Sequence, residues 1–460
     1  MFRFLHAVNS FVWGVPAFVL IAGTGLYLTV RSDFAQIRMF PAALKSFLKP
    51  LVGADDAIAR SKRKALYTAL AATVGTGNLA GVAGAIAMGG PGAVFWMWIF
   101  GILGMVTKFA EATLAVAHRK IDQNGKPIGG PMYMILNTMH HKWHFLAYCY
   151  CFFGVVASFG IGNGTQINTV IGGMNSALST FGLKGNVVLN LLVGCVLAVA
   201  VYFILSRGSD GIGAVAERLV PFAALFYVVL CFAALFVCRG AIPGALHSII
   251  KGAFSPKAAT GGIIGSFFIS LRVGAARGVF TNEAGMGTAS MAHVTAIVKH
   301  PVDQGLMGII EVFIDTIVIC TLTALVILCS GIPINYGNDM GISLTMQAFV
   351  DVFGQWVSVY ISIALCLFAF ATILGWGLYG MQCVRFLFGD GSIKYFVLLQ
   401  TVMVVISSFA RTDTLWLLTE IINGLMAIPN LIVLAKLAPE FNQILLQYKY
   451  RHPPKRVPQS

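Results

Sequence analysis

The sequence predicts an all-α polytopic membrane protein of about eleven transmembrane helices. They form a 5+5 inverted repeat with two discontinuous helices, plus one extra N-terminal helix. Of the 460 residues, 58% are hydrophobic and 10% are charged, and the mean hydropathy is +0.83, far from the composition of soluble domains. The apolar segments are about 20 residues long, enough for a helix to cross a hydrocarbon core of roughly 30 Å. Glycine-rich interruptions also recur at matching places in the two halves.

Each apolar segment along the chain is expected to form one span. The segments lie near residues 11–30, 66–88, 93–117, 145–173, 186–205, 215–238, 260–290, 305–330, 355–380, 395–410 and 413–436. The first is too long for the apolar core of a signal peptide and lacks an A-x-A-like cleavage site. We therefore expect it to remain as a membrane helix.

The basic residues orient these spans. Residues 31–64 hold eight lysines and arginines, so the positive-inside rule places this segment in the cytoplasm and the N-terminus outside. Alternation then places the C-terminus in the cytoplasm. The loops expected outside carry only Arg3, Lys184, Arg239, Lys251, Lys257 and Arg411.

Several function classes are disfavoured. The net charge of +14 is spread over juxtamembrane loops, which argues against a nucleic-acid partner. The cysteines lie in or beside spans without C-x-x-C spacing and are expected to be small core residues. His140 and His144 lack the glutamate of a zinc motif. No catalytic motif appears, so we expect no enzyme, no cofactor and no obligate protein partner.

The last ten spans divide into two units of five, residues 66–238 and 239–436. Residues 1–65 would form the extra N-terminal helix and a basic cytoplasmic loop, and residues 437–460 a basic cytoplasmic tail. Because five is odd, the two units enter the membrane from opposite sides as an inverted repeat. Each unit opens with its most glycine-interrupted helix, which predicts a binding site near the midplane between two broken helices.

The segment "TVGTGNLAG", Thr73 to Gly81, indicates what such a break offers. Glycine lets the backbone leave helical geometry and approach a ligand, while unwinding frees N–H and C=O groups that lipid cannot satisfy. The freed N–H groups suit a carboxylate, and the freed carbonyls suit a cation such as sodium. Gly81 and Gly84 are expected instead to allow close helix packing.

Four motifs carry a family resemblance. The segment that begins "GTGNLAGVAG" and the motifs "GGPMYMI", "RGVFTNEAGMGTA" and "PVDQGLMGIIEVFIDTIVIC" resemble the alanine or glycine:cation symporter family, also called sodium:alanine symporters. The resemblance runs over almost the whole chain. It implies the inverted-repeat fold of the bacterial leucine transporter and sodium-coupled import across a bacterial inner membrane. It also implies a small neutral amino acid, alanine or glycine, as substrate.

The resemblance implies a site as well. The carbonyls just before the glycines and the N–H groups of Thr76 and Gly77 would hold the ligands, and Asn78 either binds the carboxylate or braces the loop. The substrate-binding residues would be Ala72, Thr73, Thr76, Gly77, Asn78, Gln166, Thr372 and Trp376. The sodium ligands would be Ala71, Val74, Ala369 and Thr372.

Thr372 and Ala369 are spaced i, i+3 and share a helix face, so a hydroxyl and a carbonyl can complete an oxygen cage suited to sodium. The pattern resembles the common sodium site of the fold, A-x-x-T followed by a hydroxyl residue. Here Ile373 follows, so one ligand of that pattern is missing. The alternative is a Thr372 hydroxyl bonded back to its own helix at i−4.

Trp376 and Gln166 each have two interpretations. Trp376 lies one turn beyond Thr372 and is expected to wall a pocket that excludes large side chains. A tryptophan at the membrane interface is the other interpretation. Gln166 is an amide within a span. It bonds either the substrate amino group or another helix.

Charged residues also lie within the expected spans. Lys108 and Glu111 are three apart, which predicts a structural ion pair, whereas Glu311 and Asp315 are four apart and need a cation, a proton or an arginine. Structural or gating salt bridges are the expected role of most of them. The set comprises Lys108, Glu111, Arg272, Arg277, Glu283, Glu311 and Asp315.

Two rival functions stay open from the sequence. One is a symporter of the same substrates driven by protons, with Glu311 or Asp315 titrating. The other is a passive amino-acid channel or receptor that uses the same pocket without coupling. Uphill uptake under an ion gradient separates a symporter from a channel.

Overall fold

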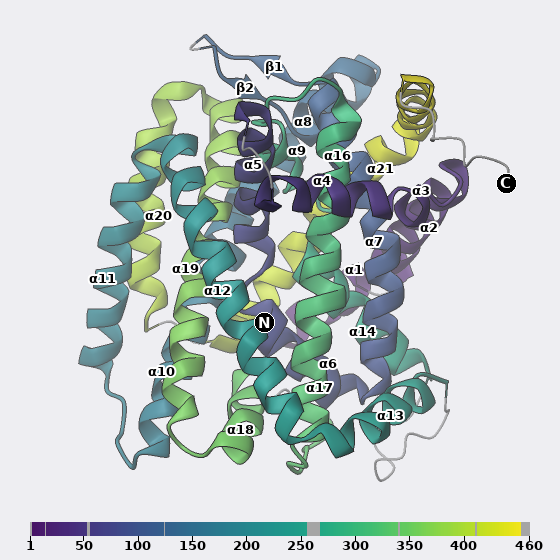
Figure 1. Cartoon of the computed structure of the whole chain (residues 1–460). Coiled ribbons are helices and arrows are strands. Elements are labelled where there is room, and N and C mark those ends of the chain that lie inside the picture. Colours follow the sequence, from purple (N-terminus) through teal and green to yellow (C-terminus); the bar gives the residue numbers. More distant parts are fainter. Residues whose placement is uncertain are drawn as a thin grey trace, which may run out of the picture.

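The computed structural model describes residues 2–13, 15–52, 56–123, 125–254, 267–338, 341–409 and 412–451. These residues are almost entirely helical (Figure 1). The strands described are β1 (Lys120–Ile121) and β2 (Pro127–Ile128), which pair antiparallel with Lys120 opposite Ile128. The predicted all-α membrane architecture is confirmed.

Helices follow one another through the first half of the chain. Its helices are α1 Phe2–Val12, α2 Val15–Arg31, α3 Ala35–Arg38, α4 Phe40–Val52, α5 Ala57–Thr73, η1 Gly77–Gly81, α6 Val82–Gly89, α7 Gly92–Ala117, α8 Pro131–Thr138, η2 His141–Trp143, α9 Phe145–Phe159, η3 Gly160–Gly164, α10 Thr165–Thr180, α11 Val187–Leu205 and α12 Gly208–Val237.

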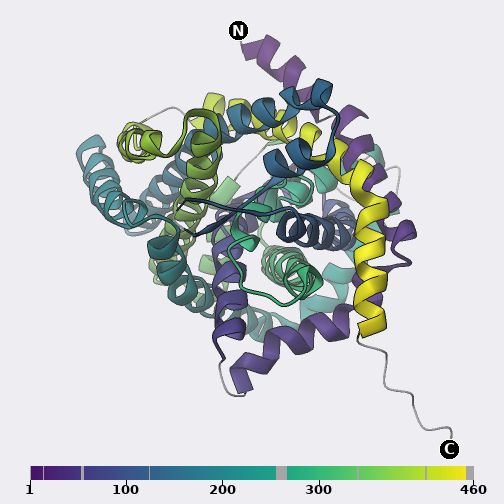
Figure 2. The ribbon, with the colours of Figure 1, turned by 90° about the horizontal axis from the view of Figure 1, so that it is seen from above.

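The second half of the chain is helical as well. Its helices are η4 Arg239–Ala241, α13 Ile242–Phe254, α14 Phe267–Asn282, α15 Ser290–His293, α16 Pro301–Val312, η5 Phe313–Cys320, α17 Thr321–Cys329, α18 Gly341–Phe353, α19 Val357–Phe388, η6 Asp390–Ser392, α20 Ile393–Ser407 and α21 Thr412–Arg451. Seen from above, the yellow α21 runs along the edge of the bundle (Figure 2).

Fewer than eleven spans are identified among the described residues. Among the described residues, eight helices are long and apolar enough to cross a membrane, or nine if the bent pair Ala57–Thr73 and Gly77–Gly89 is one span. The expected span near 11–30 is the 17-residue α2. The expected span near 260–290 contributes the 16-residue α14, and its first residues lie outside the described part of the chain. The count of eleven is therefore not confirmed.

Two boundaries differ from those expected. The first broken helix begins at Ala57 rather than near 66, since the Asp56 carboxylate caps it by accepting from the Ala59 N–H at 2.6 Å. At the other end, α21 continues to Arg451, so most of the expected tail 437–460 is helix. The extension at the start of α5 contains Arg60, Lys62, Arg63 and Lys64, and a hydropathy pattern leaves such a charged stretch out of a span.

Both expected discontinuous helices are present. In the first unit, α5 ends at Thr73 and the chain bends by 50° before η1 and α6 continue. In the second unit, α14 ends at Asn282, where Glu283 follows with φ 54°, and the short α15 resumes at Ser290.

Close helix contacts hold these breaks in place. A Cβ on Gly375 of α19 would lie 2.8 Å from the Ala72 nitrogen, and one on Gly308 of α16 would lie 2.8 Å from the Lys108 carbonyl oxygen of α7. Only glycine permits such backbone approach. Thus α19 abuts the end of α5, and α7 and α16 are pressed together.

Candidate functional site

The first break leaves four consecutive carbonyls without a hydrogen-bond donor among the described residues. The Val74 N–H makes the last helical bond, to Leu70 O at 2.8 Å. The next N–H, that of Gly75, donates to the Asn78 side-chain oxygen at 2.8 Å. The carbonyls are those of Ala71, Ala72, Thr73 and Val74. Such a run of free oxygens inside a membrane protein is suited to a cation or a polar ligand.

Asn78 braces the loop in this structure. Its oxygen accepts from Gly75, and its Nδ2 donates to the Asp315 carboxylate Oδ1 at 2.7 Å and to the Asp315 carbonyl at 3.3 Å. Both ends of the amide are therefore used by the protein. Of the two roles left open from the sequence, the geometry favours bracing.

Thr372 of α19 lies against the break. Its hydroxyl donates to Phe368 O at 3.0 Å, which is the i−4 bond weighed as an alternative, while any side chain at Gly75 would collide with the same hydroxyl. Because this bond uses the hydroxyl proton, the oxygen lone pairs stay available. Ala369 is buried on the preceding turn of α19.

Gln166 of α10 contacts the first break through Thr76. Its Oε1 accepts from the Thr76 hydroxyl at 2.9 Å, and its Nε2 donates to Ile161 O at 3.0 Å. Gly162 lies in the preceding π-helical turn η3, and because it has no side chain it leaves room for Trp376. A Cβ there would lie 2.5 Å from that of the tryptophan.

Trp376 lies in the protein interior, so the membrane-interface interpretation is wrong. Its side chain is fully buried, and the indole Nε1 donates to Glu283 Oε1 at 2.8 Å. The other oxygen of Glu283 accepts from Thr288 Oγ1 at 2.6 Å. Trp376 therefore links α19 to the second broken helix.

Glu111 holds the second break together. One oxygen, Oε1, accepts from the N–H groups of Gly285 and Gly287, each at 3.0 Å, and from Asn430 Nδ2 at 2.7 Å. The expected Lys108–Glu111 ion pair is wrong. Both residues lie on α7, but the tertiary fold places the Glu111 carboxylate against the unwound backbone after α14 rather than against Lys108.

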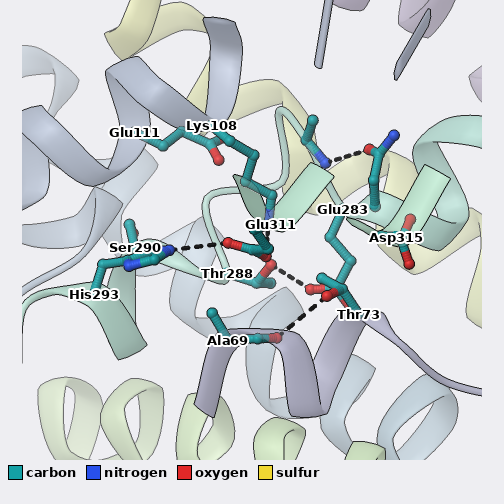
Figure 3. A network of polar contacts seen from close by, with 12 residues as sticks. Ala69, Thr73, Lys108, Glu111, Glu283, Thr288, Ser290, His293, Glu311 and Asp315 are labelled. Atoms are coloured by element: carbon teal, nitrogen blue, oxygen red, sulfur yellow. Dashed lines mark hydrogen bonds and ion pairs between the residues drawn. The ribbon is translucent and has the colours of Figure 1, made fainter. Parts of the chain in front are cut away.

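Lys108 pairs across the fold, as Figure 3 shows. Its Nζ lies 3.0 Å from Glu311 Oε1, and His293 Nε2 lies 2.9 Å from Glu311 Oε2. All three side chains are buried, at 1% exposure or less. Three elements, α7, α15 and α16, are thereby joined around one carboxylate.

Within the described part of the chain, the hydrogen-bond partners of Glu311 and Asp315 differ. Asp315 accepts from Asn78 and from the Thr316 hydroxyl at 2.8 Å, both neutral donors. Arg277 is partly exposed and pairs with Glu420 at 3.5 Å. The sequence signalled these charges by their position in spans but not their partners. Within the described residues, no cluster of three or more His, Cys, Asp or Glu side chains could hold a metal ion.

Two interrupted helices, the first with free backbone carbonyls among the described residues, are enclosed by intact helices and define a secondary transporter rather than an enzyme. The profile of the sodium:alanine symporter family matches residues 1–459, and the chain belongs to this family. The resemblance found in the motifs is confirmed.

Two relatives agree with this family assignment, and one solved structure shares the fold. The chain is 39% identical to a sodium/alanine symporter of Methanococcus maripaludis, with 94% of each chain covered. It is 36% identical to a probable sodium/glutamine symporter of Bacillus subtilis, with 93% of this chain and 86% of the relative covered. The fold matches that of the transporter MhsT, solved with L-phenylalanine, at a TM-score of 0.56 and 13% identity over 84% of this chain and 97% of that one.

Proposed function

We propose that this protein is a sodium-coupled symporter that imports a small neutral amino acid, alanine or glycine, by alternating access. The observation that carries the proposal is the run of free carbonyls from Ala71 to Val74 beside the Thr372 hydroxyl. The names of the relatives, sodium/alanine and sodium/glutamine symporters, support the ion and the substrate class. The proposed setting is a bacterial inner membrane, with the N-terminus outside and the C-terminus in the cytoplasm.

The substrate carboxylate would bind at the start of η1. The N–H groups of Thr76 and Gly77 donate to no acceptor within the described residues, as expected for the first residues of a helix. Orphan N–H groups at a helix N-terminus attract an anion. Ala72 and Thr73 would line the same loop, and Gln166, held by Thr76, would face the amino group.

Sodium would bind to the carbonyls of Ala71, Val74 and Ala369 and to the Thr372 hydroxyl, since hard cations prefer oxygen ligands. Thr372→Val keeps the shape but deletes the oxygen, so the sodium concentration for half-maximal alanine uptake is expected to rise about tenfold or more. Thr372→Ser, which retains the oxygen, is the matched control. An unchanged sodium curve in the valine variant would leave only the i−4 bond as the role of this hydroxyl.

Trp376 would set the size of the substrate side chain. Overfilling the wild-type site with a larger side chain costs about 1–3 kcal/mol, or about 5- to 150-fold in affinity. Trp376→Ala is therefore expected to admit valine and leucine as competitors of labelled alanine, and to weaken alanine itself, which loses contact surface. Trp376→Phe keeps a ring but loses the bond to Glu283, and so separates size selection from that bond. Identical competitor rankings in wild type and Trp376→Ala would remove the assignment.

Coupling is tested with purified protein in liposomes, by measuring alanine uptake under sodium, potassium and proton gradients in turn. Uphill uptake under sodium alone is expected. One observation favours a proton-driven alternative: the described partners of the Asp315 carboxylate, directly behind the loop, are neutral. Uphill uptake under a proton gradient that Asp315→Asn abolishes would establish that alternative, and uptake that never runs uphill would establish a channel.

A further inference from the structure

The outward face of α12 carries two arginines without partners. Arg207, just before the helix, and Arg218, three turns along it, are both exposed. Neither guanidinium group makes a hydrogen bond or an ion pair with any described residue. The acidic residues of α12 do not neutralise them, because Asp210 binds Lys126 at 2.7 Å and Lys64 at 3.7 Å, while Glu217 lies 3.8 Å from Arg63.

Both arginines line one surface hollow of about 460 Å³, together with Gly211, Ala214, Val215, Leu219 and Phe222. Arg207 folds over α12 toward this hollow, because a Cβ on Gly211 would lie only 3.4 Å from its Cδ. Helical side chains lean toward the N-terminus of their helix, so Arg218 leans back toward Ala214. The two guanidinium groups therefore converge from opposite ends.

The hollow continues into an apolar groove. Phe222 also lines a second hollow of about 560 Å³, formed with Leu225, Phe226 and Val229 of α12 and aromatic residues near the start of α19. From residue 219 to 237 the helix has no charged side chain, so Arg218 marks the boundary between the apolar core and the headgroup region. Figure 1 shows α12 on the outside of the bundle.

We propose that this face of α12 binds an anionic phospholipid from the leaflet at the N-terminal end of the helix. The phosphate lies between Arg207 and Arg218 above the small Ala214, where two guanidinium groups donate charge-assisted bonds. An acyl chain lies along Leu219 and Phe222. The occupant is a lipid rather than a soluble anion because the cationic hollow opens directly into an apolar groove within the membrane.

Native mass spectrometry of the purified full-length protein in neutral detergent tests this site. The probes are phosphatidylglycerol, cardiolipin and phosphatidylethanolamine with the same acyl chains. The wild type is expected to retain the two anionic lipids in preference to phosphatidylethanolamine. The double variant Arg207→Gln/Arg218→Gln is expected to lose about 30-fold in affinity for the anionic lipids.

Two further variants make the result decisive. Lys120→Gln/Lys142→Gln removes the same charge from exposed positions in β1 and η2 and should bind like the wild type. Ala214→Trp fills the hollow while both arginines stay, and should bind as poorly as the arginine variant. The proposal is overturned if the two double variants bind alike, if Ala214→Trp binds normally, if phosphatidylethanolamine binds equally well, or if soluble glycerol phosphate displaces the lipid.

Discussion

Gly75→Ala is expected to reduce alanine uptake by about tenfold or more, because an added methyl group collides with the Thr372 hydroxyl and overpacking costs about 1–3 kcal/mol. The collision falls where the first broken helix and α19 meet, which is the proposed sodium site. The methyl group also displaces the N–H that Asn78 holds. Initial rates in sodium-driven liposomes measure the loss, and size-exclusion elution reports that the variant still folds.

Gly81→Ala is the matched control from the same broken helix. A Cβ there has one neighbour within 4 Å, Thr281 Cγ2 at 3.8 Å, which is an ordinary van der Waals contact. Uptake by this variant is expected to stay near that of the wild type. Equal uptake by Gly75→Ala and Gly81→Ala would show that the contact with Thr372 has no part in transport.

Lys108→Met is expected to destabilise the protein by about 3–5 kcal/mol, since it leaves the buried Glu311 carboxylate without its lysine. Among the described residues, His293 then remains in contact with that carboxylate. Three elements meet at Glu311, so the loss should loosen α15 as well as α7 and α16. Thermal unfolding in detergent, followed by tryptophan fluorescence, measures the change.

The double variant Lys108→Met/Glu311→Gln removes the stranded charge and keeps an amide oxygen for His293. It is expected to recover most of the lost stability, because the cost arises from an unpaired buried charge and not from the missing pair. If the double variant is less stable than Lys108→Met alone, Glu311 needs its charge for another reason and the ion-pair interpretation fails.

The apolar helices were the most predictable part of the fold. Residues 93–117 were expected as a span, and α7 covers Gly92–Ala117, because twenty or more apolar residues can satisfy their backbone in lipid only as a helix. The start of α5 was missed because "AIARSKRK" is helical but lies where charged side chains reach water. Hydropathy reports contact with lipid, and a helix continues beyond that contact.

The position of the first break could also be predicted, since three glycines and an asparagine interrupt an apolar run only for a local reason. The partners of buried charges could not. Lys108 and Glu111 share a face of α7, yet Lys108 bonds a residue of α16 and Glu111 bonds the backbone after α14. Spacing along one helix determines the side of the helix on which a side chain lies. The partner of that side chain depends on which other part of the fold packs against that side.

The 50° bend between α5 and η1 has a mechanical consequence. The segment Gly77–Gly89 is a lever arm of about 20 Å, so turning it by about 20° moves its far end by about 7 Å, enough for an alanine to pass. Such a rotation breaks no helical hydrogen bond at the pivot, because the carbonyls from Ala71 to Val74 hold none within the described chain. A cation bound by those carbonyls and by Thr372 would stiffen the pivot. The fraction of time that the cation site is occupied would then set how often the segment Gly77–Gly89 rotates.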